Sequence, residues 1–203
     1  MANPPHESSR PTGHEVDLLG VWFRRVVQSD PSAFESLFRA TRESLVRYAF
    51  QITGDEAAAA DMVQEAFLRF WQRRREHDPS GSVKALLFRT VRNLALNSVR
   101  DGKRRAQLLA EGYEPPARAT PDPDETLAGQ ELAGRIRGWM EELPDRQREA
   151  LTLSRFQGLS HEEIAEVMGV APRTVNNHLV RALRTLRDRI EAHREGSSVQ
   201  GAG

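Results

Sequence analysis

Hydrophobic residues recur three and four positions apart along most of this 203-residue chain, which is the spacing of one face of an α-helix. The helical spacing runs from about residue 30 to 105, with breaks at residues 53–55 and 77–81, and it returns from 125 to 190. No stretch shows the sustained alternation of apolar and polar residues that a half-buried strand needs. The pattern therefore predicts an all-α protein, with three helices in the first stretch.

Segments of different composition separate and flank these helical stretches. Residues 106–126 are rich in proline and acidic residues and lack a sustained period, which is typical of a flexible linker. The chain opens with Pro, Ser, His and Gly, and a short apolar patch after them predicts about one helical turn. We expect two small helical domains joined by a flexible linker: an N-terminal tail at 1–28, domains at 29–105 and 127–192, the linker at 106–126, and a flexible C-terminal tail at 193–203.

The second domain carries the signals of a helix-turn-helix. Ser160 and Glu163 form a capping box, in which each side chain accepts a hydrogen bond from the backbone amide of the other, so a helix starts there. Gly169 can adopt the left-handed backbone of a tight corner, and Pro172 suits the first position of the next helix, where no amide donor is needed. This ordered series is much more specific than its parts and predicts a DNA-binding unit.

The second helix of that unit has an apolar side and a basic side. The apolar stripe consists of Val175, Leu179, Ala182, Leu183, Leu186 and Ile190. Arginine and asparagine on the opposite side can make paired hydrogen bonds with guanine and adenine edges in the major groove. An arginine-rich side also fits a solvated surface helix, so the base-reading interpretation depends on the whole series and not on the arginines alone.

The segment LPDRQREALTLSRFQGLSHEEIAEVMGVAPRTVNNHLVRALRTLR, residues 143–187, resembles domain 4 of the extracytoplasmic-function (ECF) sigma factors, small members of the primary-sigma (sigma-70) family. In that family this domain reads the −35 promoter element. The helix that begins this segment is expected to bury Ala150, Leu151, Leu153 and Phe156. Ala171 departs from the family pattern, where a capping Ser, Thr or Asp is frequent. The resemblance implies DNA contacts by Arg173, Thr174, Asn176, Asn177, Arg181 and Arg184.

In the first domain, Leu68 lies outside the apolar stripe of its helix. At roughly 100° per residue it falls about 20° from Asp61 and between Gln64 and Glu65, on the polar side. Isolated exposed leucines are common, so the position alone does not establish a partner surface. The segment DMVQEAFLRFW, residues 61–71, resembles the sigma segment that docks on the clamp helices of the largest RNA polymerase subunit. The resemblance implies polymerase contacts by Asp61, Gln64, Glu65 and Leu68.

The third helix, expected from about residue 82 to 100, has a basic outer face with an aromatic residue at its edge. Such a face suits single-stranded DNA, because phosphates need positive charge and an unstacked base needs a flat apolar partner. The segment SVKALLFRTVRNLALNSVRDGKRR, residues 82–105, resembles the part of sigma domain 2 that opens the −10 element, and the preceding loop, residues 75–82, corresponds to the pocket for a flipped base. The candidate −10 residues are Phe88, Arg89, Arg92, Asn93 and Arg100.

The charge of the chain is unevenly distributed. Its 29 basic and 29 acidic residues cancel, but residues 84–105 hold seven bases and one acid, and residues 173–194 hold six bases and two acids. A neutral total therefore conceals two basic surfaces suited to phosphates. Cysteine is absent, which agrees with a cytoplasmic location, and no apolar run is long enough to span a membrane. No metal-ligand spacing, phosphate-binding glycine loop or catalytic triad is found, so we expect no metal, no cofactor and no enzyme.

Together these features favour a sigma factor over a response-regulator-type activator, a repressor or a nuclease. The first two alternatives share the helix-turn-helix, but the first domain lacks the strand-helix alternation of a receiver. The resemblance implies two sigma domains, domain 2 and domain 4, that bind core RNA polymerase at its clamp helices and flap region, together with promoter DNA. It also implies control by an anti-sigma factor and no membrane insertion of the chain itself.

Overall fold

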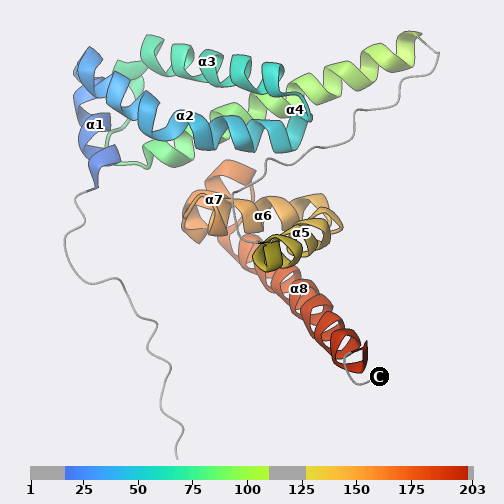
Figure 1. Cartoon of the computed structure of the whole chain (residues 1–203). Coiled ribbons are helices and arrows are strands. Elements are labelled where there is room, and N and C mark those ends of the chain that lie inside the picture. The colour runs from blue at the N-terminus through green and yellow to red at the C-terminus, as the bar shows by residue number, and fades with distance from the viewer. Residues whose placement is uncertain (1–16, 110–126, 201–203) are drawn as a thin grey trace, which may run out of the picture.

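A computed structural model of the protein describes residues 17–109 and 127–200, and its described part is helical, without strands. The helices form two groups, α1–α4 and α5–α8, which lie one above the other in Figure 1. The expected all-α architecture is thereby confirmed. In the N-terminal domain the elements are α1 (Leu18–Val27), α2 (Pro31–Thr53), α3 (Glu56–Gln72), the 3₁₀ turn η1 (Arg74–Glu76) and α4 (Val83–Leu109). In the C-terminal domain they are α5 (Leu127–Glu141), α6 (Asp145–Arg155), α7 (His161–Met168) and α8 (Pro172–Gln200).

Helices α2 and α3 begin and end where the sequence predicts. The Asp30 carboxylate accepts from the amides of Ser32 and Ala33 at 2.9 and 3.2 Å, and Pro31 occupies the first turn of α2. Gly54 ends the helix at φ 72°, a left-handed conformation that costs glycine little. The next helix packs the rings of Phe67 and Phe70 into the core against α2.

Helix α1 corrects the prediction for the N-terminus. We expected a tail with about one helical turn at residues 1–28, whereas a ten-residue helix lies within it. Asp17 caps this helix through the Gly20 amide at 3.0 Å, and Phe23 and Val26 are fully buried against the N-terminal domain. The apolar patch therefore belongs to the core, which begins about ten residues earlier than expected. The rest of the predicted tail, residues 1–16, lies outside the described residues.

The C-terminal domain has the predicted helix-turn-helix. The capping box of Ser160 and Glu163 is formed in both directions, Gly169 closes α7 at φ 66°, and Pro172 starts α8. Val175 is buried on the inner side of α8, as expected. Two apolar residues depart from the prediction. Leu183, expected in the apolar stripe of α8, is 41% exposed. Phe156 caps the end of α6 and is 65% exposed, because the chain turns there and its side chain no longer lies on the inner stripe.

The predicted linker and C-terminal tail are also shorter than expected. Helix α4 continues to Leu109, and only residues 110–126 of the predicted linker lie outside the described residues. Helix α8 continues to Gln200, through most of the segment expected to be a flexible tail, because extending an existing helix is far easier than starting one. The last three residues, 201–203, are outside the described part.

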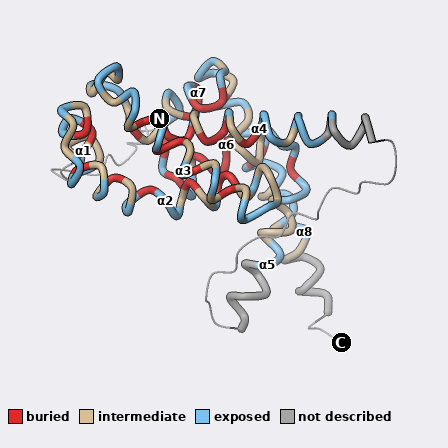
Figure 2. The backbone as a smooth tube through the Cα atoms, turned by 90° about the horizontal axis from the view of Figure 1, so that it is seen from above, coloured by how far each residue is buried: buried red, intermediate tan, exposed pale blue. Residues whose placement is uncertain are grey.

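The two domains pack directly on one another. Helix α4 lies between α2 and α3 on one side and α7 on the other, so it is covered from two directions. Figure 2 shows buried positions along α2, α3, α6 and α7, whereas the described side chains of α8 beyond Ala182 are exposed or half-buried. Contacts between α4 and the C-terminal domain therefore decide which part of α4 can reach a ligand.

Candidate nucleic-acid and polymerase interfaces

The outer face of α8 is open to solvent. Its inner side is anchored by Val175, Leu179 and Ala182, which are at most 6% exposed. The corner before it is tightened by the amide of Thr174, which donates to the Ala171 carbonyl at 2.8 Å and so replaces the side-chain cap that Ala171 cannot supply. Of the candidate −35 residues only Thr174 is half-buried, and the exposed ones are Arg173, Asn176, Asn177, Arg181 and Arg184.

No ion pair engages the three arginines of that face within the part of the chain that the structure describes. Guanidinium groups that are hydrated and unpaired keep all their donors available for base edges and phosphates. The structure therefore presents the predicted reading face of α8 as one continuous exposed surface.

The polar side of α3 is also exposed. Leu68 is 50% exposed, next to exposed Asp61 and Gln64, while Glu65 is half-buried and pairs with Arg69 at 2.6 Å. On the opposite side of the helix, Phe67 packs edge to face against Phe34 and Phe38 of α2. The predicted surroundings of Leu68 are thus present: an apolar side chain among polar ones on a helix held firmly from behind.

An open hollow of about 420 Å³ lies beside the N-terminal half of α4. Arg89 and Asn93 of the candidate −10 set line it and are exposed. His77, from the loop predicted to form the base pocket, stacks on Phe70 with ring centroids 5.2 Å apart. Burial lowers the pKa of His77, so its ring is neutral at pH 7. The remaining lining residues are Arg69, Phe70, Arg73, Glu76, Leu86, Thr90, Leu94 and Asn97.

Two residues of the candidate −10 set are not where the sequence placed them. Phe88 was expected at the edge of the outer face and Arg92 on it, but Phe88 is 0% exposed and Arg92 7%. Phe88 packs edge to face on Tyr48 of α2 with centroids 5.2 Å apart. The prediction treated α4 as a helix with one buried side, whereas α4 has a second covered side along residues 88, 92 and 95.

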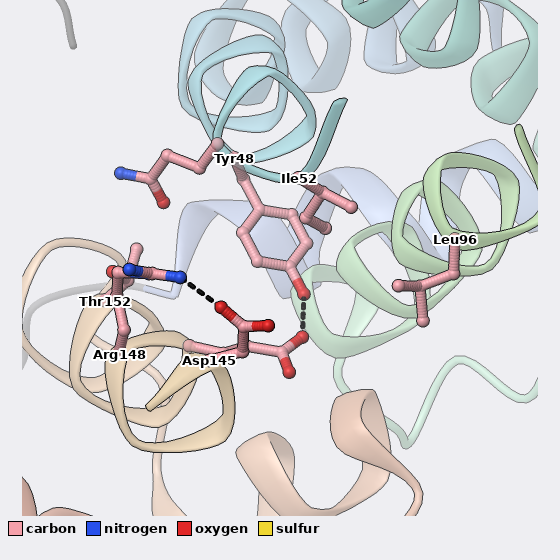
Figure 3. A pocket seen from close by; sticks show the side chains of 8 residues that line it. Tyr48, Ile52, Leu96, Asp145, Arg148 and Thr152 are labelled. Atoms are coloured by element: carbon pink, nitrogen blue, oxygen red, sulfur yellow. Dashed lines mark hydrogen bonds and ion pairs between the residues drawn. The ribbon is translucent and has the colours of Figure 1, made fainter. Parts of the chain in front are cut away.

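The second covered side of α4 faces acidic residues of the C-terminal domain. Glu149 of α6 accepts from the Arg92 guanidinium at 2.6 and 3.3 Å and from the Tyr48 hydroxyl at 2.8 Å. Figure 3 shows the Tyr48 ring pointing from α2 toward α6, with its hydroxyl bonded to that carboxylate. Farther along α4, Arg89 pairs with Glu166 of α7 at 3.0 Å.

Two further hydrogen bonds join the domains. The Ser82 hydroxyl donates to Glu163, and the Lys84 ammonium donates to the backbone carbonyl of Gln157. We call this set of contacts the interdomain seam. Its N-terminal-domain members are Tyr48, Ser82, Lys84, Arg89 and Arg92, and its C-terminal-domain members are Glu149, Gln157, Glu163 and Glu166.

The seam changes the electrostatics of its members. Burial opposes the charge of Arg92, but the hydrogen bonds and charge of Glu149 outweigh burial and raise the pKa of the guanidinium. Burial, reinforced by the charge of Glu149, raises the pKa of Tyr48 well above its usual 10. Burial lowers the pKa of Lys84, against the opposing pull of Glu163. Arg92 and Glu149 are therefore held as an ion pair, with a neutral phenol beside it.

Sequence reasoning missed the acidic half of the seam and one positioning residue of the loop. Glu149 and Glu166 look like ordinary solvated acids of amphipathic helices, and only charge complementarity with α4 could have indicated them. Ser29 has φ 68°, unusual for a residue with a side chain, and its hydroxyl accepts from Arg74 and Arg75 at 2.9 and 3.3 Å. Nothing in the local sequence predicts that link.

Within the described ranges, no cluster of His, Asp and Glu is arranged to hold a metal ion. Among those same residues, no helix combines the length and the apolar character required to span a lipid bilayer.

Two family models match this chain, each on one of its domains. The model described as Sigma-70 region 2 matches residues 37–105, and Sigma-70, region 4 matches residues 134–186. Helices α2–α4 lie largely in the first match, and α6, α7 and the exposed reading face of α8 lie in the second.

Relatives and solved structures agree with these matches. The ECF RNA polymerase sigma factor SigE of Mycolicibacterium smegmatis is 30% identical over 188 residues, which cover 92% of this chain and 70% of SigE. SigL of Mycobacterium tuberculosis is 30% identical over 161 residues, covering 78% and 89%. The fold matches the Bartonella quintana sigma factor RpoE, solved in complex with the anti-sigma factor NepR, at TM-score 0.64 and 23% identity over 78% of this chain and 96% of that one. A second match is CnrH in complex with the cytosolic domain of CnrY, at TM-score 0.60 and 23% identity over 87% and 99%. The chain belongs to the ECF group of RNA polymerase sigma factors.

Proposed function

We propose that three faces of this sigma factor divide the work of promoter-directed initiation, and that the exposed face of α8 reads the −35 element. The observation that carries this assignment is the contrast between the two sides of α8: the inner side is buried, and the outer side presents Asn177 and its neighbouring arginines free of ion pairs within the described residues. Paired hydrogen bonds from such side chains discriminate bases by about 1–3 kcal/mol each.

The hollow beside α4 is the proposed site for the −10 strand. Arg89 and Asn93 line it together with the apolar side chains of Phe70, Leu86 and Leu94, and Arg100 lies farther along the same helix. Capturing an extruded base there would offset an unstacking cost of a few kcal/mol and shift the duplex toward the open state. Phe88 supports this helix from the core and is no longer proposed as a stacking surface. Arg92 can join the site only when Glu149 leaves it.

The exposed face of α3 is the proposed polymerase contact, with Leu68 as its apolar centre and Asp61, Gln64 and Glu65 around it. The C-terminal domain would contact the flap region, and the functional units would be residues 29–105, extended by α1, and 127–192. A factor of this kind acts in the bacterial cytoplasm and catalyses no bond chemistry, which belongs to the polymerase. Control by an anti-sigma factor is part of the proposal, supported by the family and by the complexes in which similar folds were solved.

The direct test is transcription by the reconstituted enzyme. Purified chain is added to bacterial core RNA polymerase with a pool of genomic fragments from the organism that encodes it, and the 5′ ends of the transcripts are sequenced. We expect a small set of start sites that share two motifs at a constant spacing, one for each DNA-facing helix. Transcripts without a shared motif, or none above core polymerase alone, would overturn the proposal.

A further inference from the structure

From the interdomain seam, we infer that the C-terminal domain is a competitor of DNA for the −10 face of its own chain. The acidic side of α6 and α7 occupies part of the surface of α4 that the proposed function assigns to the −10 strand, so this inference rests on that function. The chain would then exist in a closed state, in which the seam is formed, and an open state, in which α4 can bind a strand.

The charges at the seam match those of a nucleic-acid backbone. Glu149 and Glu166 place carboxylate oxygens 2.6 and 3.0 Å from guanidinium nitrogens of Arg92 and Arg89. Phosphate oxygens bind guanidinium groups at the same distances and with the same paired geometry. A carboxylate that holds Arg92 by two hydrogen bonds therefore excludes a phosphate from that arginine, and the competition is direct.

The two ion pairs of the seam differ in how deeply they are buried, and this difference predicts which one contributes more to closure. The side chains of Arg92 and Glu149 are 8% and 15% exposed, whereas those of Arg89 and Glu166 are each 44% exposed. Exposed pairs contribute little and are screened by salt, while a buried pair is screened much less. Removing one partner of a buried pair leaves the other without compensation unless the domains separate and water reaches it. The Arg92–Glu149 pair is thus the contact whose loss most favours opening.

The seam is less complete than a domain core, which suits a contact that must open. A hollow of about 110 Å³ remains between Tyr48, Ile52 and Leu96 on one side and α6 on the other (Figure 3). The hydroxyl of Thr152 lines this hollow, buried and without a hydrogen-bond partner among the described residues. A permanent interface would be expected to fill such a space and satisfy such a group.

The test measures closure directly by energy transfer between two dyes. The chain has no cysteine, so Arg42→Cys on α2 and Arg187→Cys on α8, both exposed positions, can be labelled without further changes. Glu149→Lys in this background is expected to lower the transfer efficiency. The matched control is Glu162→Lys on α7, which makes the same charge change at an exposed residue that forms no ion pair within the described ranges. The control should retain the transfer efficiency of the parent protein.

Binding of a 25-nucleotide oligothymidylate gives the second readout. If one molecule in ten is open before the change and nearly all are open after it, apparent affinity rises about tenfold, because affinity scales with the competent fraction. Glu162→Lys should change it much less. Adding Arg92→Glu to Glu149→Lys reverses the pair, so it should restore energy transfer and return oligonucleotide affinity to the parental level or below. Circular dichroism melting confirms that each variant is folded.

The inference is overturned if the parent protein and Glu149→Lys show equal energy transfer at 0.1 M salt, or if both lysine variants bind the oligonucleotide equally. Failure of the proposed function has a different signature. In that case the dye pair would report closure and its loss as expected, while the chain would direct no promoter-selective transcription with core polymerase.

Discussion

Helices α4 and α8 both carry basic residues suited to DNA, but the structure treats them in opposite ways. On α8 the exposed arginines of the reading face, Arg173, Arg181 and Arg184, lack ion-pair partners within the described residues, and only the apolar side is covered. On α4 two of the candidate arginines are paired with acids of the other domain, and Arg92 is almost fully buried. The first helix met by the promoter would therefore be α8, and α4 would follow only after rearrangement.

The difference teaches that a basic helix is not by itself a binding surface. Both helices have the same kind of periodicity and a similar excess of positive charge in sequence. What separates them is the acidic side of α6 and α7. Glu149 and Glu166 on that side pair with arginines of α4, and they do not pair with the arginines of the α8 reading face. Long-range charge pairing between domains decides availability, and local sequence carries no record of it.

The largest expected effect concerns the proposed polymerase contact on α3. A variant there would show whether polymerase binding is independent of the difference between the open α8 and the covered α4. Leu68→Glu places a charge at the centre of the proposed contact, and we expect core affinity to fall about 30-fold or more, the size of an interface hot spot. Binding of labelled chain to core polymerase, followed by fluorescence anisotropy, measures it. Leu18→Glu changes an equally exposed leucine on α1 and serves as the control. An unchanged affinity for Leu68→Glu would remove α3 from the polymerase contact.

A pair of asparagine variants tests the proposed DNA contacts of the protein helices α8 and α4 separately. Asn177→Ala on α8 should reduce −35 discrimination roughly tenfold, because it removes one paired base contact, and it should do so in the free chain as well as in the holoenzyme. Asn93→Ala on α4 should act only in the holoenzyme, after opening. Competition binding with matched and mutated promoter fragments separates the two. If Asn93→Ala weakened specific binding by the free chain as strongly as Asn177→Ala, the contrast between open and covered helices would be wrong.

A smaller effect is expected at the hydrogen bond that flanks the buried ion pair. Tyr48→Phe keeps the ring on Phe88 and removes the hydroxyl, so closure should weaken by about 1 kcal/mol, roughly fivefold in the closed-to-open ratio. The pKa of Tyr48 is raised by burial and by Glu149, so the contribution of this bond to closure is fully present below about pH 10 and is lost progressively as the pH rises from there through the raised value.

Dye-pair transfer between pH 7 and 11 provides the measurement. The parent protein should lose part of its closure at the alkaline end, and Tyr48→Phe should be less affected over the same range. A parent protein that opened between pH 7 and 9 would point to a different titrating group.

An effect of similar size, confined to the stability of one domain, belongs to the cap of the helix-turn-helix. Ser160→Ala removes the side-chain half of the α7 cap, and the stability of the C-terminal domain should fall by about 1 kcal/mol. Urea unfolding detects this as a lower midpoint with unchanged slope. Ser160→Thr keeps the hydroxyl and should retain most of the stability. The open face of α8 should still bind DNA in the folded fraction, since the change leaves its side chains in place.

Much of the fold was accessible from sequence because its signals are local. The helix break at residues 53–55, the Ser160–Glu163 box and the Gly169 corner each depend on residues within four positions, and the structure has all three. The exposure of Leu68 and of the α8 face followed from helical periodicity alone. Features that depend on the two domains meeting were not accessible, as Arg92 shows most clearly: it was predicted on an exposed outer face of α4, but the C-terminal domain covers it there.

The ends of two helices were also predicted wrongly from the sequence. Both α1 and the last turns of α8 lie in segments whose composition resembles that of tails. Burial of Phe23 overrides the weak local preference at the first site, and continuation of an existing helix does so at the second. Composition predicts where a helix could begin independently, but not where packing or an upstream turn sustains one.

The Glu163 carboxylate has two roles: it caps α7, and it accepts a hydrogen bond across the interdomain seam. One of its oxygens accepts from the Ser160 amide and completes the cap of α7, and the other accepts from Ser82 across the seam. Aspartate is one methylene shorter and could not span both, and glutamine would offer only a single acceptor oxygen. Natural variation at this position should therefore be narrower than at its neighbour Glu162, since selection for a well-formed promoter reader and selection for a chain that stays closed act on the same side chain.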